Sequence, residues 1–148
     1  MKKNPTIVPA TLPLAPPSTL IVVAAALLRE DGKILLQKRP EGRAMAGLWE
    51  FPGGKQEIGE LAEAALVREL QEELAITVEI SDLQPLCFAS AHISERPLLL
   101  LLYLCRRWSG SPVAVESPEL GWFVVDEMAQ LSMPPADIPL LDLLKKLI

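Results

Sequence analysis

The chain has 148 residues, with 14 Lys and Arg against 19 Asp and Glu, and a formal net charge of −5. This length predicts one domain with a single core. The acidic balance argues against stable binding of a nucleic-acid polymer, because polyanion binders normally present a basic face. A small phosphorylated ligand remains compatible with the charge if metal ions bridge the like charges.

The two cysteines and the single histidine are too few for a structural zinc site, and the sequence contains no CxxC pair. Cys87 and Cys105 both lie in apolar runs, which predicts buried thiols in a reducing compartment. His92 is interpreted as a structural or solvent-facing residue rather than a catalyst.

The apolar run at 20–28 follows Lys2 and Lys3 and so imitates a secretory signal. However, five prolines lie between these charges and the run, and the run is far too short to span a membrane. We therefore expect a cytoplasmic protein with no export signal and no membrane partner.

The first half of the chain contains two strand-like runs and one helical run. Residues 1–18 are rich in Pro, Thr and Ala and predict an extended, poorly ordered arm, with packing on a partner subunit as the alternative. Residues 19–29 and 33–39 are predicted strands, which Asp31-Gly32 joins as a hairpin. Residues 40–55, with four glycines and two prolines, are predicted to form a loop. The pattern from 61 to 74 predicts a helix.

The second half predicts more strands and two helices. Residues 76–80 and 85–91 are β-prone, 95–108 contains a buried strand, 121–125 is a short strand, and helices are expected from 126 and over 138–147. This order predicts an α/β fold, in which one domain over 19–148 has a mixed sheet covered on both faces by helices.

Three glutamates of the 61–74 helix share one face. At about 100° per residue, Glu69, Glu72 and Glu73 project together, while Leu66 and Leu70 point to a different side and form the core stripe. Mg²⁺ or Mn²⁺ prefers oxygen ligands and would relieve the repulsion between these carboxylates. From the helix alone, a solvated glutamate-rich surface is common and is the preferred interpretation.

The residues before the helix favour a ligand site. The glycines of Phe51-Pro52-Gly53-Gly54-Lys55 allow close approach of backbone to a ligand, and Lys55 could meet a phosphate. Glu60 adds a carboxylate, and Arg68 could orient a neighbouring glutamate by a forked hydrogen bond. The run is not a Walker P-loop, because Gln56 follows Lys55 where Ser or Thr is required.

At this spacing the chain resembles the Nudix hydrolases. Their box reads G-x5-E-x7-R-E-U-x-E-E-x-G-U, with U apolar, and Gly54 to Ile76 match it except at the last glycine, which is Ala75 here. The similarity covers about residues 20–147 and is greatest to the MutT-like branch. It implies the Nudix fold, an α/β/α sandwich with a mixed sheet. It also implies metal-dependent cleavage of a nucleoside triphosphate to the monophosphate and pyrophosphate.

The resemblance assigns roles to residues of the box and its surroundings. It implies metal ligation by the carbonyl of Gly53 and by Glu69, Glu72, Glu73 and Glu116. It makes Glu69 a candidate base for the attacking water, with Glu73 also catalytic. It further implies that Glu60 supports the metal or its waters and that Arg68 orients Glu69.

Three residues are candidates for base recognition. Arg39 aligns with a base-contacting arginine of MutT-like enzymes, or is a surface charge; Phe51 lines the base pocket, or fills the core. Asp137 stands where a MutT-like enzyme has Asn. An ionised Asp only accepts hydrogen bonds, so it could read N7–H of 8-oxoguanine or the amino group of cytosine. Alternatively, it only caps the last helix.

These residues predict a nucleotide-pool sanitising enzyme acting on 8-oxo-dGTP, with a role in DNA repair. The alternative is a CTP or dCTP pyrophosphohydrolase; an ADP-ribose hydrolase and a non-catalytic Nudix-like sensor are less favoured. Both a monomer and a homodimer are compatible with the sequence. Ala75 either accepts a left-handed conformation or ends the helix differently, and we expect it to affect stability rather than catalysis.

Overall fold

The computed structural model describes residues 18–148. The expected N-terminal arm lies outside the described residues except for Ser18. A four-stranded sheet has the order β4-β1-β6-β5, formed by β4 (Gly53–Lys55), β1 (Leu20–Leu27), β6 (Arg96–Cys105) and β5 (Leu83–Ile93). It is mixed, because β1 and β6 are parallel while the other pairs are antiparallel. An antiparallel sheet has the order β3-β2-β7, formed by β3 (Trp49–Glu50), β2 (Ile34–Lys38) and β7 (Leu120–Phe123).

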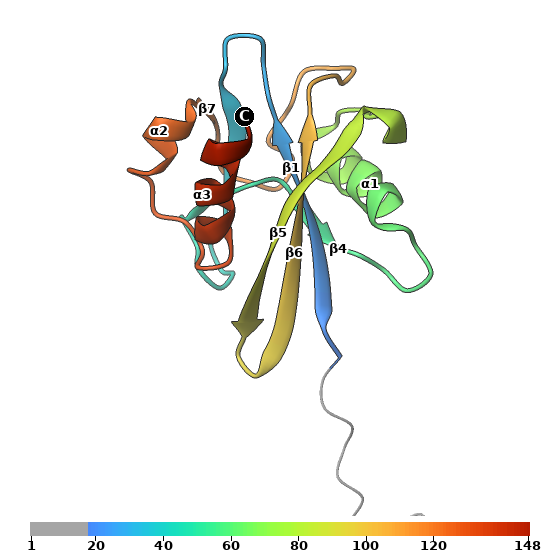
Figure 1. Cartoon of the computed structure of the whole chain (residues 1–148), viewed down its shortest axis with the longest axis vertical. Coiled ribbons are helices and arrows are strands. Elements are labelled where there is room, and N and C mark those ends of the chain that lie inside the picture. Colours follow the sequence, from blue (N-terminus) through green and yellow to red (C-terminus); the bar gives the residue numbers. More distant parts are fainter. Residues whose placement is uncertain (1–17) are drawn as a thin grey trace, which may run out of the picture.

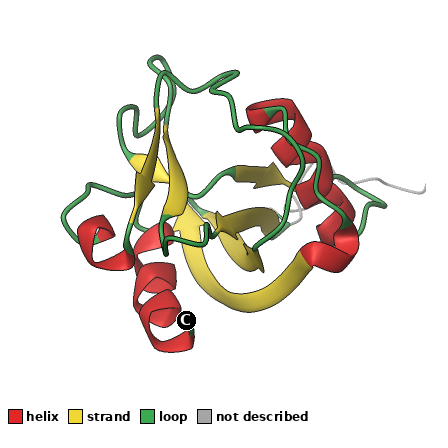
Figure 2. Cartoon of the chain, turned by 90° about the horizontal axis from the view of Figure 1, so that it is seen from above, coloured by secondary structure: helices red, strands yellow, loops and turns green. Residues whose placement is uncertain are grey.

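The helices cover both faces of the four-stranded sheet. They are α1 (Ala62–Leu74), α2 (Val125–Met128) and α3 (Asp137–Leu147), with the short 3₁₀ helix η1 (Ile80–Asp82). Figure 1 shows α1 at one side of the strands and α2 with α3 at the other, and Figure 2 shows the same layers from above. The predicted α/β sandwich with a mixed sheet is confirmed. Every helix in residues 18–148 is too short or too polar to cross a bilayer.

The central strand β1 explains this layering. Its side chains alternate between the two faces of the sheet, and both faces are buried. Val23 and Leu27 belong to the apolar cluster on the α1 side, whereas Ala24 and Ala26 belong to the cluster on the α3 side. A strand that is apolar at every position therefore supports two cores, one under each helical layer.

The predicted hairpin between the first two strands is wrong. The turn forms, since the Gly32 amide donates to the Arg29 carbonyl at 3.0 Å, but a single bridge at Leu28 and Ile34 joins the two runs. The strands then diverge into different sheets. The reason is competition for backbone groups: β6 pairs along the whole of β1, and β4 takes its other edge at Val22–Ala24.

Two other segment predictions also need correction. The expected loop at 40–55 contains β3 and β4, two strands too short to carry an alternating pattern of their own. Residues 76–80 do not form a strand; Thr77 makes one bridge to Ser109, and η1 follows. In both segments, tertiary pairing rather than local preference decides the backbone conformation.

Candidate active site

Helix α1 carries the glutamate face and ends on an unusual residue. The helix buries Leu66, Leu70 and Leu74, as the periodicity predicts. Ala75 adopts the left-handed conformation with φ 56° and ψ 34°, and its amide donates to the Gln71 carbonyl at 3.1 Å. Ala75 thus accepts the glycine-type stop, at a cost on the order of 1 kcal/mol relative to glycine.

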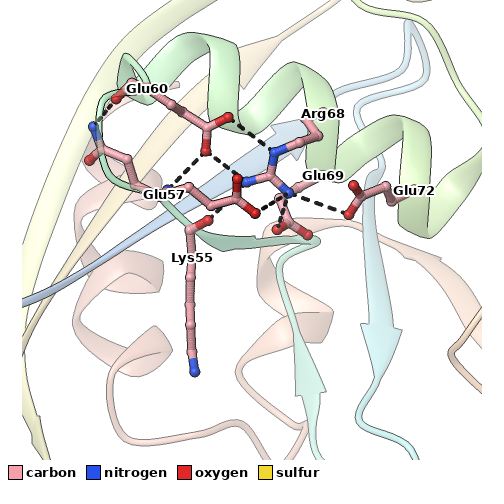
Figure 3. A network of polar contacts seen from close by, with 7 residues as sticks. Lys55, Glu57, Glu60, Arg68, Glu69 and Glu72 are labelled. Atoms are coloured by element: carbon pink, nitrogen blue, oxygen red, sulfur yellow. Dashed lines mark hydrogen bonds and ion pairs between the residues drawn. The ribbon is translucent and has the colours of Figure 1, made fainter.

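Arg68 lies at the centre of a carboxylate network on this helix, shown in Figure 3. Its Nε and Nη2 atoms donate to the two oxygens of Glu60 at 3.0 and 2.7 Å, forming the fork expected of guanidinium with carboxylate. Its Nη1 donates to Glu69 at 3.0 Å and to Glu72 at 3.4 Å. The hydrogen bonds from Arg68 are the main reason that the pKa of Glu60 falls to about 2. Glu60 is therefore held ionised.

Glu73 is held from the other side of the site. Its Oε2 accepts a hydrogen bond from Gln37 Nε2 at 2.8 Å and another from the Gly53 amide at 3.2 Å. Burial nevertheless raises the pKa of Glu73 to about 7, and burial also raises the pKa of Glu69. Two partly desolvated carboxylates side by side favour a bound cation, because the cation offsets the cost of their charge.

The Gly53-Gly54 backbone fits closely between β1 and helix α1. It pairs with Val23 and Ala24 of β1. A Cβ atom on Gly53 would overlap the Val23 carbonyl, and one on Gly54 would overlap the Glu69 carboxylate. Glycine is therefore required at 53 for the close approach to β1, and at 54 the missing Cβ leaves room for the Glu69 carboxylate.

The donor set suits a hard divalent cation, because it consists of carboxylate and carbonyl oxygens. Within residues 18–148, however, no three acidic side chains are gathered in ready metal-binding positions. Glu69 and Glu72 turn toward Arg68, whereas Glu73 turns toward Gln37. Glu116 lines the same narrow cavity as Glu73. Gathering Glu69 and Glu72 with Glu73 around one cation would therefore require rotation of the Glu69 and Glu72 side chains.

The side chain of Lys55 does not join the carboxylate network. Its carbonyl accepts a hydrogen bond from Arg68 Nη2 at 3.1 Å, but Figure 3 shows its side chain pointing away from the carboxylate network. The contact of Lys55 with a phosphate stays a prediction.

A second polar cluster contains Arg39 and Asp137. Arg39 Nη1 pairs with Glu50 at 2.9 Å, and its Nε donates to the Ala44 carbonyl, so Arg39 is not a free surface charge. Asp137 is 6% exposed, and its Oδ2 accepts a hydrogen bond from the Phe51 amide at 3.2 Å. Burial raises the pKa of Asp137 to about 7, and the charge of Glu50 adds to the rise.

The structure bears on the alternative interpretations of Asp137 as a helix cap and of Phe51 as a core residue. Asp137 does not cap the last helix, because Ala136 occupies the N-cap position and no side-chain cap bond forms. Phe51 is 3% exposed and belongs to the apolar cluster on the α3 side, as the core-filling interpretation expects.

Sequence reasoning missed Gln37 and Glu50. Gln37 is a single amide after the apolar run Ile34–Leu36 and is 5% exposed, and a lone polar residue in a buried strand was the available signal. Glu50 lay in a predicted loop, and no sequence signal distinguished it. The two residues pair directly across β2 and β3, and they line one cavity together with Arg39, Glu73 and Glu116.

A wider, open depression lies elsewhere on the surface. It is lined by Arg29, Arg106, Arg107 and Trp108 among others, and it contains none of the predicted site residues.

Comparison with known proteins defines the class. A model of the NUDIX domain matches residues 23–143. The chain belongs to the Nudix hydrolase family, whose members generally depend on divalent metal, and it is MutT-like within that family.

The chain is similar to two enzymes and one protein of solved structure from E. coli. It is 40% identical over 126 residues to the CTP pyrophosphohydrolase of Escherichia coli (strain K12), covering 83% of this chain and 90% of that one. It is 35% identical over 127 residues to the 8-oxo-dGTP diphosphatase of the same organism, covering 84% and 96%. The solution structure of the E. coli ORF135 protein superposes with a TM-score of 0.79 at 38% identity, covering 90% and 94%.

Proposed function

We propose that this chain is a divalent-metal-dependent nucleoside triphosphate pyrophosphohydrolase. The observation that carries the proposal is the cavity between the two polar clusters. Glu73 and Glu116, which we assign to the metal site, line it together with Arg39 and Glu50. We infer that a triphosphate at the box carboxylates would have its base directed toward Arg39 and Glu50, which line the same cavity.

The reaction is a displacement at the β-phosphorus. The oxygen of water forms a bond to this phosphorus, while the bond to the oxygen bridging the α- and β-phosphates breaks. Nucleoside monophosphate and pyrophosphate leave, and the water proton passes to a base, for which Glu69 is the candidate. Bound Mg²⁺ or Mn²⁺ supplies charge neutralisation and lowers the pKa of water.

The remaining roles belong to residues of the box and its surroundings. We assign metal ligation to the Gly53 carbonyl and to Glu69, Glu72, Glu73 and Glu116. Arg68 orients Glu69 by its hydrogen bond and ties Glu60 to the same network. Because Arg68 already contacts Glu69 and Glu72, it keeps these carboxylates from separating before metal binds.

A cytosine nucleotide is the substrate that the second cluster fits best. Asp137 and Glu50 place two carboxyl groups near each other, and a carboxylate accepts from the amino group of cytosine. The 40% identity to a CTP pyrophosphohydrolase, against 35% to an 8-oxo-dGTP diphosphatase, points the same way. We therefore rank a cytosine nucleotide above 8-oxo-dGTP, which reverses the preference that the sequence suggested.

One observation supports 8-oxo-dGTP as the second candidate. With a pKa of about 7, Asp137 is partly protonated at neutral pH. Its protonated form could donate to O6 of the base, which the ionised form could not. In this case the enzyme would remove oxidised guanine nucleotides before DNA synthesis uses them.

The test is a substrate panel of CTP, dCTP, 5-methyl-dCTP, 8-oxo-dGTP, dGTP and ADP-ribose with Mg²⁺. Monophosphate and pyrophosphate are quantified, and Glu73→Gln purified identically controls for contaminating hydrolases. We expect the highest kcat/KM for a cytosine nucleotide. A higher value for 8-oxo-dGTP would select the second candidate, and cleavage of none of the triphosphates would overturn the proposal.

A further inference from the structure

A buried amide in β2 has only one hydrogen-bond partner in the described part of the chain. Gln37 is 5% exposed and follows three fully buried apolar residues. Burying an amide group costs free energy unless it is hydrogen-bonded. The Gln37 side chain uses its Nε2 to donate to Glu73 Oε2 at 2.8 Å, across 36 positions of sequence.

The two oxygens of Glu73 are therefore not equivalent. Oε2 accepts from Gln37 and from the Gly53 amide at 3.2 Å, whereas Oε1 has no hydrogen-bond partner within residues 18–148. Two donors on one oxygen fix the rotation of the carboxyl group. They also leave only Oε1 ready to accept a ligand bond.

We propose that Gln37 is a positioning residue for Glu73, which it holds by Oε2 so that Oε1 alone serves as the metal-binding atom. This inference rests on the proposed metal-dependent function. A carboxylate can bind a divalent cation through one oxygen or through both. Occupying Oε2 selects the single-oxygen mode, as partners outside the ligand shell do in metal sites.

A purely structural role explains Gln37 less well. Ile34, Leu35 and Leu36 are all fully buried, so an aliphatic side chain at 37 would extend the same apolar surface. An amide offers what an aliphatic residue lacks, namely a neutral donor aimed at a carboxylate. A cationic donor would instead form an ion pair with Glu73 and compete with the metal.

The experiment measures Mn²⁺ binding to the nucleotide-free protein by electron paramagnetic resonance. In Gln37→Met, which keeps the shape and removes the donor, we expect the affinity for Mn²⁺ to fall by about 10- to 100-fold. The matched control is Gln71→Met, since Gln71 is exposed on the same helix as Glu73. Gln71→Met should keep the wild-type affinity for Mn²⁺. Gln37→Leu replaces Gln37→Met if the latter does not fold.

A double mutant separates positioning from general damage. In a Glu73→Gln background, Gln37→Met should have little further effect on Mn²⁺ affinity, because the carboxylate that it positions is gone. Wild-type affinity in Gln37→Met, or an undiminished effect in the double mutant, would overturn the inference while leaving the proposed function intact. A wild-type protein that binds no Mn²⁺ would overturn both.

Discussion

The two polar clusters of this protein are built in opposite ways. The box cluster comes from one stretch of chain, and Arg68 reaches Glu60, Glu69 and Glu72 through the turns of α1 and the loop before it. The second polar cluster is assembled from Arg39 directly after β2, Glu50 of β3 and Asp137 of α3. There, Asp137 meets the Phe51 amide across 86 positions of sequence. The first cluster is partly open to solvent, whereas Asp137 is almost fully buried.

The difference in solvent exposure between the two clusters indicates which chemistry each cluster suits. In the box cluster the hydrogen bonds from Arg68 keep Glu60 ionised, whereas burial raises the pKa of Glu69 and Glu73. A buried cluster raises the pKa of its acids, as it does for Glu50 and Asp137. The first suits binding of cations and phosphate, and the second suits discrimination between hydrogen-bond donors and acceptors on a base.

The largest expected effect comes from breaking the box cluster. Glu73→Gln should lower kcat by about a hundredfold or more, because loss of a metal-binding carboxylate removes several kcal/mol of transition-state stabilisation. Steady-state kinetics with CTP measures this, and the melting temperature verifies folding. A folded variant with wild-type turnover would exclude Glu73 from the metal site.

A smaller effect is expected from changing the second polar cluster alone. Asp137→Asn replaces an acceptor by a group that also donates, so the ratio of kcat/KM for 8-oxo-dGTP over CTP should rise by about tenfold or more. Asp142→Asn is the matched control, because Asp142 is exposed on the same helix. An unchanged ratio in Asp137→Asn would remove Asp137 from base recognition.

The burial of Asp137 also predicts how stability depends on pH. Its folded pKa of about 7 lies above its ordinary value, so the folded state binds this proton more tightly than the unfolded state does. The free energy of unfolding therefore falls as pH rises from about 4 to about 7, and the full loss is present above about 7.

Asp137→Asn should remove this dependence and be more stable than the wild type at about pH 8, with a smaller difference at about pH 4.5. Urea unfolding at the two pH values measures this difference. Contributions from Glu73 cancel, because both proteins contain it. Equal slopes with pH in the two proteins would contradict the burial argument.

The smallest effect is expected at the end of α1. Ala75→Gly relieves the left-handed conformation and should raise the free energy of unfolding by about 1 kcal/mol, with activity unchanged. Ala64→Gly in the helix interior should have the opposite sign. Thermal unfolding of both variants tests this, and a loss of activity in Ala75→Gly would show that the helix end contributes to function.

Much of the fold could be predicted from local pattern. The α1 boundaries and the buried stripe of Leu66, Leu70 and Leu74 follow from a period near 3.6. The hairpin prediction was wrong because a turn signal at Asp31-Gly32 specifies only the reversal of the chain. Which strands then pair depended on β6, whose paired residues in β1 are about 80 positions away, as for Leu20 and Leu98. Strands β3 and β4 were missed because two or three residues are too few to show an alternating pattern.

The sequence by itself determined the acidic face of this protein, because helical spacing and the Gly53-Gly54 pair act within one short segment. The common orientation of Glu69, Glu72 and Glu73 therefore follows from their spacing along one helix. Only the tertiary structure decided that Gln37 holds Glu73 and that Asp137 lies buried beside Phe51. Neither contact has a spacing that a sequence pattern could encode, since each joins elements brought together by packing of the sheets and helices.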